Sequence, residues 1–206
     1  MNKVLKIMFQ KIKQIIPAPF KKIIKKILGR EDVRNSDIIP YIKKSLRDDI
    51  VTVLDVGCGK LWEGNSKSED ILFSLFADLR YKITGIDIFE ECISWRKENG
   101  PPGVYLTMDA KKLRDLSGKF DLVIAHHILE HMNKEESQNL LEEMERKALK
   151  QVIIGAPIGF TNTEYAVTSH RNPYERHFCA WFPEEFERRG YQVYKIKNVF
   201  LAFKNV

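Results

Sequence analysis

Short apolar runs alternate with helix-like segments from residue 49 onward in this 206-residue chain, and this alternation restricts the fold more than any other feature. Five runs are typical of buried strands: residues 49–57, 81–89, 103–110, 119–127 and 150–158. Helical patterns fall on residues 68–79, 90–98, 134–148 and 182–190. Residues 191–197 and 199–204 follow each other so closely that they predict a hairpin. The order predicts an α/β fold whose seven-stranded sheet is mostly parallel, with helices on both faces and an antiparallel strand in the C-terminal hairpin.

The ends of four predicted strands carry residue types that bind small ligands. Gly57 to Gly59 follow the first strand, Asp87 and Asp109 come at the ends of the second and third, and residues 126–131 follow the fourth. Ligands of parallel sheets bind beyond the carboxyl ends of the strands. We therefore expect these four clusters to line one crevice.

The loop after the first strand, "VGCGKLWEG", restricts the kind of ligand. Gly57 and Gly59 predict a sharp turn with backbone close to a ligand, although a plain tight turn would use the same spacing. A dinucleotide-binding loop needs a third glycine to receive a pyrophosphate, and this chain has Trp62 there. Asp87 is placed to accept hydrogen bonds from a ribose diol. The pattern favours a nucleoside that carries no phosphates.

Four sequence blocks in this order resemble motifs of the class I S-adenosylmethionine-dependent methyltransferases, of the type 11/12 kind: "VLDVGCG", "ITGIDI", "MDA" and "FDLVIAHHILEHM". The resemblance covers residues 35–206 and implies a Rossmann-like domain with S-adenosylmethionine as its cofactor. The chain departs from the family at Leu61, where a third glycine is common, and in the length of the loop that follows.

The resemblance also implies how the cofactor is held. Asp55 and the two glycines would hold its methionine end, Asp87 the ribose hydroxyls, Ile88 and Met108 the adenine ring, and Asp109 the adenine amino group. The expected cofactor-binding residues are Asp55, Gly57, Cys58, Gly59, Asp87, Ile88, Met108, Asp109, Ala110 and His126.

His127, Glu130 and His131 are the predicted catalytic residues. Their spacing of i, i+3 and i+4 would place them on one face of a helix. Methyl transfer to a hydroxyl needs a group that takes up a proton, and imidazole, with an ordinary pKa of about 6.5, suits that role. Glu130 would orient one of the two rings. The alternative is that these histidines only pack beneath the next helix.

The same residues also invite two metal-based interpretations. They match H-x-x-E-H, a zinc-protease pattern, but they follow a strand directly, which disfavours proteolysis. Some RNA 2′-O-methyltransferases of this fold hold a divalent metal with a similar cluster, which here would add His170 or His177 from the later loop. Glutamate is expected where this chain has His127, so the preferred interpretation assigns no metal ligand.

The polar and aromatic segment between the fifth strand and the last predicted helix is a candidate acceptor site. Loops of this length in compact domains are usually functional or disordered. Arg171, Tyr174 and His177 are the expected substrate-binding residues, because they suit a polar or anionic acceptor. The part "ERHFCAWFPEEF" resembles a segment of bacterial and archaeal members of the family, including some linked to cell-surface glycan synthesis.

The positive charge of the chain belongs to its first thirty residues. The net charge is +6, yet residues 1–30 hold nine Lys/Arg and no acid, and the remainder holds 25 basic and 28 acidic residues. Apolar residues at helical spacing over residues 3–28, interrupted by Pro17 and Pro19, predict two short amphipathic helices that contact an anionic membrane surface. Docking on the domain is the alternative. The chain thus divides into a basic segment, residues 1–30, and a methyltransferase domain, residues 31–206.

The predicted function is methyl transfer from S-adenosylmethionine to a small-molecule, glycan or lipid-linked acceptor. The alternatives are methylation of RNA or protein, and a non-catalytic partner subunit that binds the cofactor. Nucleic acid is disfavoured because the domain is slightly acidic. Three scattered cysteines and the lack of a long apolar run predict a cytoplasmic protein, with the basic helices as a peripheral attachment to the inner face of the membrane.

Overall fold

The computed structural model describes residues 34–61, 66–161 and 172–206. The amphipathic helices predicted for residues 3–28, with their membrane contact, lie outside the described residues, as do Trp62, His170 and Arg171. Val33–Val206 form one compact unit, which we describe by itself. None of the helices in the described ranges is both long enough and apolar enough to cross a membrane.

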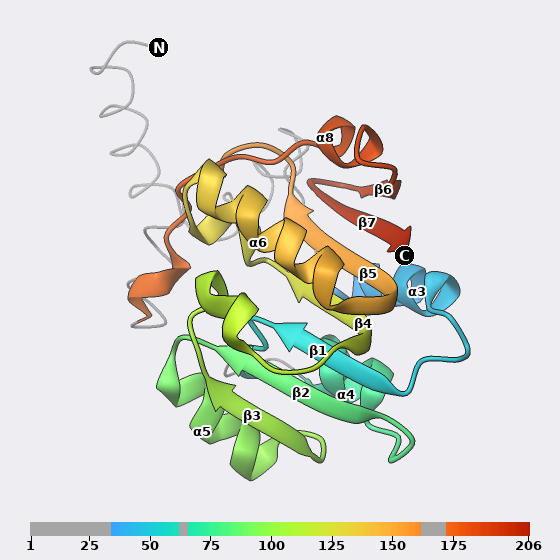
Figure 1. Ribbon diagram of the computed structural model, residues 1–206, viewed down its shortest axis with the longest axis vertical. Helices are drawn as coiled ribbons and strands as arrows, with labels where there is room; N and C mark the ends of the chain where they lie inside the picture. Colours follow the sequence, from blue (N-terminus) through green and yellow to red (C-terminus); the bar gives the residue numbers. More distant parts are fainter. Residues whose placement is uncertain (1–33, 62–65, 162–171) are drawn as a thin grey trace, which may run out of the picture. The chain divides into compact units, whose positions relative to one another are not determined.

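A seven-stranded sheet in the order β3-β2-β1-β4-β5-β7-β6 forms the centre of this unit (Figure 1). The strands β1 to β5 pair in parallel, and β7 runs antiparallel to both β5 and β6. Their bounds are Thr52–Val56 (β1), Lys82–Asp87 (β2), Gly103–Thr107 (β3), Phe120–His126 (β4), Ala148–Pro157 (β5), Gln192–Ile196 (β6) and Val199–Asn205 (β7). The predicted α/β class, the strand content and the C-terminal hairpin are confirmed.

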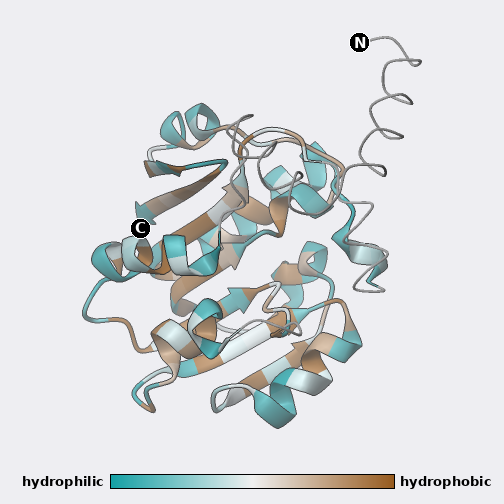
Figure 2. Ribbon diagram, turned by 180° about the vertical axis from the view of Figure 1, so that it is seen from behind, coloured by the Kyte–Doolittle hydropathy of each residue, from teal (hydrophilic) through white to brown (hydrophobic). Residues whose placement is uncertain are grey.

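Helices cover both faces of the sheet, as predicted, with α6 in front of it and α4 behind it in Figure 1. The bounds are Asn35–Ser45 (α3), Ile71–Phe76 (α4), Glu90–Asn99 (α5), Lys134–Lys147 (α6) and Pro183–Glu187 (α8). One apolar core includes Leu141 and Met144 of α6, and the other includes Ile38 of α3 and Phe76 of α4. The central strands are therefore apolar on both sides, which explains their continuous apolar runs and their brown colour in Figure 2.

Two helices differ from the sequence analysis. The helix α3 was not predicted, although Ile38 and Ile42 are completely buried; Pro40 inside it obscures the helical pattern. The helix predicted for residues 68–79 is shorter, because Asp70 takes an extended conformation and caps α4 by accepting a hydrogen bond from the amide of Phe73 at 3.1 Å. A separate 3-10 turn, η1 (Lys67–Glu69), precedes this cap.

The strand register brings the predicted ligand-binding loops to one edge of the sheet. Val56 at the end of β1 pairs with Ile86 of β2 on one side and with Ala125 of β4 on the other. The next residues along these three strands are Gly57, Asp87 and His126, so they leave the sheet side by side. The strands β2 and β3 lie on one side of β1, and β4 and β5 lie on the other side. The ligand crevice of α/β sheets forms where the strand order reverses in this way.

At the amino-terminal ends of the strands, Asp121 connects the start of β4 to the start of β1. Its carboxylate accepts hydrogen bonds from the amides of Val51 and Thr52 at 2.9 and 3.0 Å and forms an ion pair with Lys150 at 3.1 Å. Burial alone would raise the pKa of this carboxyl. The two hydrogen bonds and the lysine outweigh that effect and lower the pKa to about 2.

We expect Asp121→Asn to lower the free energy of unfolding at pH 7 by about 1–2 kcal/mol, because hydrogen bonds to a charged acceptor are replaced by weaker ones. The folded-state pKa lies below the unfolded value, so the stabilisation is present above about pH 4 and is lost as the pH falls toward 2. Urea unfolding of both proteins between pH 6 and 2.5 measures this, with exposed Asp48→Asn as the control. A stability difference that does not change over this range would contradict the prediction.

Candidate functional site

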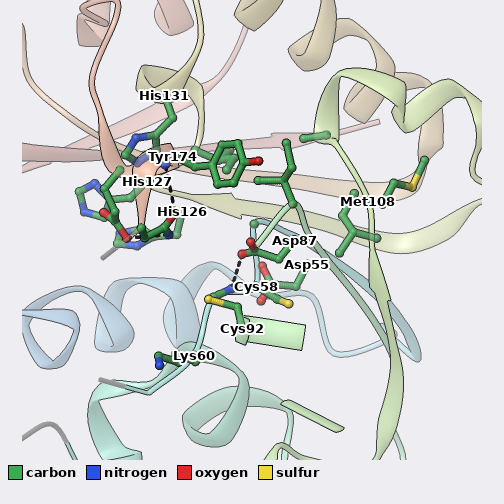
Figure 3. A pocket seen from close by; sticks show the side chains of 18 of the residues that line it. Asp55, Cys58, Lys60, Asp87, Cys92, Met108, His126, His127, His131 and Tyr174 are labelled. Atoms are coloured by element: carbon green, nitrogen blue, oxygen red, sulfur yellow. Dashed lines mark hydrogen bonds between the residues drawn. The ribbon is translucent and has the colours of Figure 1, made fainter. Parts of the chain in front are cut away.

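A cavity of about 670 Å³ opens at the carboxyl edge of the sheet, a volume typical of small-ligand sites. All ten expected cofactor-binding residues line it, as do His127, His131 and Tyr174. Figure 3 shows Asp55, Asp87 and Cys58 on one side of the cavity and the three neighbouring histidines on the other. The four predicted clusters therefore do meet in one crevice.

The glycine loop forms the wall of the cavity next to β2. Gly57 and Gly59 have φ angles of +75° and +53°, which favour glycine. A Cβ on Gly57 would lie 2.6 Å from Cδ1 of Ile128, so this position has no room for a side chain. The amides of Gly57 and Cys58 donate to the carbonyl of Ile86 at 2.8 and 3.0 Å. The loop thus folds back over the end of β2 and presents bare backbone to the cavity.

Asp87 fixes the geometry between this loop and the start of α5. Its carboxylate accepts hydrogen bonds from the amide of Gly59 at 2.9 Å and from the amide of Phe89 at 2.8 Å. Burial raises the pKa of this carboxyl, and the two hydrogen bonds oppose that shift. The oxygens retain further acceptor capacity toward the cavity, which suits a diol donor such as ribose.

Asp55 lies beneath the loop with 7% of its surface exposed. Burial raises the pKa of its carboxyl to about 7; Arg96 opposes the shift, and Asp70 and Asp87 add to it. A buried carboxyl of this kind is a receptor for a cationic group, because a nearby positive charge would restore its ionised form.

Arg96 of α5 supports the loop from below and was missed by the sequence analysis. Its guanidinium is 3% exposed, forms a bidentate pair with Asp70 at 2.7 and 3.1 Å, and donates to the carbonyls of Cys58 and Gly59 at 2.6 and 2.9 Å. One buried charge thus connects α4, α5 and the glycine loop. In the sequence, an arginine within a charged helix gives no signal of this role.

His127 occupies an unusual backbone conformation just after β4. Its φ is +56°, and its amide donates to the carbonyl of Gly155 at 2.8 Å. Its Nδ1 donates to Oε1 of Glu130 at 2.9 Å, and 41% of its side chain is exposed. Residues 127, 130 and 131 do not share a helix face, because only Leu129–His131 form a 3-10 turn, η3. The left-handed residue brings the imidazole to the carboxylate instead.

Glu130 is buried, with 1% of its surface exposed. Burial would raise the pKa of its carboxyl, but the hydrogen bond from His127 and the nearby charges of His127 and His131 outweigh it and lower the pKa. Its Oε2 has no hydrogen-bond partner among the described residues. The residue is therefore a carboxylate that holds His127 and has acceptor capacity left over.

His126 lies at the junction of β4 and β5. A Cβ on Gly155 would lie 2.1 Å from Cδ2 of His126, so only glycine leaves room for this ring. Burial lowers the pKa of His126 well below its ordinary value. The residue therefore contributes a neutral ring to the wall of the cavity.

The two described substrate-binding candidates lie in different environments. Tyr174, in the 3-10 turn η4 (Pro173–Glu175), is 46% exposed at the cavity, with its ring centroid 6.5 Å from that of Phe89. The His177 side chain is only 7% exposed and lies 3.9 Å from Oε1 of Glu130. Burial lowers the pKa of His177 to about 4, with Glu130 opposing the shift. Tyr174 thus faces the cavity, whereas His177 packs behind it.

The comparisons with known proteins agree with this geometry. Residues 54–152 match the family model described as a methyltransferase domain. The chain is 34% identical over 89 residues to the mitochondrial ubiquinone biosynthesis O-methyltransferase of Saccharomyces cerevisiae. That match covers 40% of this chain and 26% of the yeast protein, so the chain spans about a quarter of the curated relative it matches.

Solved structures share the fold. Magnesium protoporphyrin IX methyltransferase from Synechocystis, with bound SAH, has a TM-score of 0.58 at 13% identity and covers 95% of this chain and 98% of that one. A SAM-dependent methyltransferase from Archaeoglobus fulgidus has a TM-score of 0.58 at 18% identity and covers 84% and 92%. The chain therefore carries a methyltransferase domain with the fold of the S-adenosylmethionine-dependent methyltransferases, and S-adenosylmethionine is its cofactor.

Proposed function

We propose that this protein transfers the methyl group of S-adenosylmethionine to a hydroxyl of a small-molecule, glycan or lipid-linked acceptor. In this proposal His127 is the general base and Glu130 orients it. The observation that carries the proposal is the 2.9 Å hydrogen bond between Nδ1 of His127, which lines the cavity, and the buried carboxylate of Glu130. Donation through Nδ1 leaves the lone pair on Nε2, the nitrogen that would take up a proton.

The cavity suits the cofactor. Its glycine loop has no third glycine for a pyrophosphate, and the buried carboxyl of Asp55 and the half-buried carboxyl of Asp87 favour a cation over phosphates. Asp87 would hold the ribose hydroxyls, Asp55 the methionine end, and Asp109 the adenine amino group. When bound, the cofactor supplies a methyl carbon on a positively charged sulfur.

The protein's own part in the reaction is alignment and proton removal. The cavity walls would hold the acceptor oxygen in line with the methyl carbon and its bond to sulfur. When the carbon–oxygen bond forms, the electron pair of the broken carbon–sulfur bond would remain on the cofactor's sulfur, and His127 would take the hydroxyl proton. Glu130 stabilises the resulting imidazolium, because its carboxylate accepts the hydrogen bond from Nδ1.

The acceptor side of the cavity is aromatic. Tyr174 and Phe178 both line it and are 46% and 59% exposed, which suits an acceptor with an aromatic, apolar or sugar ring beside its hydroxyl. The yeast relative is named as an O-methyltransferase of ubiquinone biosynthesis, and one matched structure as a magnesium protoporphyrin IX methyltransferase. Both names support a small-molecule acceptor for this chain.

His127→Ala should reduce turnover by about 100-fold or more, because it removes the base, while cofactor affinity stays within a few-fold of wild type. The acceptor is first identified by S-adenosylhomocysteine release with quinol, sugar, lipid-extract and RNA panels. The variant is then assayed on that acceptor, with calorimetry to confirm cofactor binding and exposed Lys112→Ala as the control. Unchanged turnover in His127→Ala would remove this residue from the mechanism. An RNA acceptor would overturn the proposed acceptor class.

Cofactor binding near pH 7 should release protons from Asp55. The pKa of about 7 leaves this carboxyl partly protonated in the free protein, and a bound cation favours its ionised form. The binding enthalpy measured in phosphate and in Tris at pH 7 should therefore differ in proportion to the buffers' ionisation enthalpies. At pH 9, where Asp55 is already ionised, the difference should vanish. Equal enthalpies in both buffers at pH 7 would contradict this role for Asp55.

A further inference from the structure

Glu130, His131 and His177 form a cluster, and His131 of this cluster lines the cavity. Each offers one potential ligand atom, and these atoms lie within 4.8 Å of one another. His127 lies outside this set and donates to Glu130. The structure therefore brings together residues from η3 and from the segment after η4 that are 46 positions apart in the chain.

The buried carboxylate gives a second, independent indication of a ligand. Glu130 is 1% exposed, and its Oε2 has no hydrogen-bond partner among the described residues. A carboxylate oxygen buried in this way costs free energy unless a donor or a cation satisfies it. A cation held jointly with the two neighbouring imidazoles would supply that partner.

The surroundings also orient the imidazole of His131 as a ligand. Nδ1 of His131 donates to the carbonyl of Arg176 at 3.2 Å, which fixes the tautomer and leaves Nε2 with its lone pair. Metal-binding histidines are commonly held by such a bond to a backbone carbonyl. The rings of His131 and His177 meet edge to face with centroids 4.8 Å apart.

The separation between the carboxyl group of Glu130 and His177 is close to that of two ligands of one ion. Nε2 of His177 lies 3.9 Å from this carboxyl group, measured to Oε1, the oxygen that also accepts from His127, and this is too far for a direct hydrogen bond. Two ligand atoms about 2.1 Å from a tetrahedral metal are about 3.4 Å apart, so a small closure of the pair would complete the site. The amide of Phe178 donates to the carbonyl of Glu130 at 2.8 Å and ties the two segments together.

We propose that Glu130, His131 and His177 bind a divalent transition-metal ion such as Zn²⁺. Two imidazoles and one carboxylate suit Zn²⁺, Fe²⁺ or Co²⁺, whereas Mg²⁺ and Ca²⁺ prefer oxygen ligands alone. Three protein ligands leave one coordination position for water or an acceptor oxygen, and His131, which lines the cavity, would place the ion next to the proposed acceptor site. In this extension, which rests on the proposed methyl transfer, the metal lowers the pKa of the acceptor hydroxyl whose proton His127 receives.

Tag-free wild-type protein stripped with a chelator and titrated with Co²⁺ tests the site by visible absorption. We expect one equivalent per chain with the bands of an imidazole- and carboxylate-bound ion. His177→Ala and Glu130→Gln should each weaken Co²⁺ binding by about 100-fold or more. Cofactor calorimetry and thermal unfolding show that the variants are folded. Should one variant not fold, the other and the chelated wild type still give the answer.

His127→Ala separates this proposal from the proposed function. It should keep its equivalent of Co²⁺ while losing turnover, because His127 lies outside the ligand cluster. Failure of the wild type to bind Co²⁺, or equal binding by His177→Ala, would overturn the metal site even if His127→Ala is inactive. Full turnover in His127→Ala with Co²⁺ still bound would instead overturn the role of His127 as base and leave the metal site standing.

Discussion

The arrangement of the pocket depends on the hydrogen bonds and the ion pair that the buried guanidinium of Arg96 makes. This guanidinium joins Asp70, which caps α4, to the carbonyls of Cys58 and Gly59 in the glycine loop. A buried charge is tolerated only when such partners surround it, so the helices and the loop hold their positions together. Because the loop carbonyls point toward Arg96, the amides of the loop point away from it, and the amide of Gly59 donates a hydrogen bond to Asp87 at 2.9 Å. The glycine loop, the two helices and the carboxylate of Asp87 therefore form one connected unit.

The two sides of the pocket, which meet between β1 and β4, differ in the charged groups that they carry. On one side, burial raises the pKa values of the carboxyls of Asp55 and Asp87, and these groups favour a cation. On the other side, a buried carboxylate, Glu130, is surrounded by imidazoles from η3 and the late segment. Because β1 and β4 are neighbours, the two halves face the same space. A methyl group on a charged sulfur and a hydroxyl that must lose a proton are suited to such a divided site.

The sequence was sufficient to predict the sheet and the loops at the strand ends, because the spacing of apolar residues and the positions of the glycines reflect local structure. The strand ends predicted from the sequence bring Gly57, Asp87 and His126 to one crevice, as the structure shows. Prediction from the sequence failed where the outcome depends on long-range packing. Nothing in the sequence marks Arg96, within a charged helix, as a buried charge, and nothing indicates the positive φ of His127. The packing of His177 against Glu130 is likewise visible only in the tertiary structure, because the sequence does not show which side of a loop faces inward.

Calorimetric titration of the full-length protein with S-adenosylmethionine, S-adenosylhomocysteine and ATP tests the central claim most directly, which is that this crevice recognises an adenosine bearing a cationic sulfur and no phosphates. The account predicts saturable binding of about one equivalent of each of the first two compounds and none of ATP at the same concentrations. Absence of binding by both sulfur compounds, or equal affinity for ATP, would contradict it.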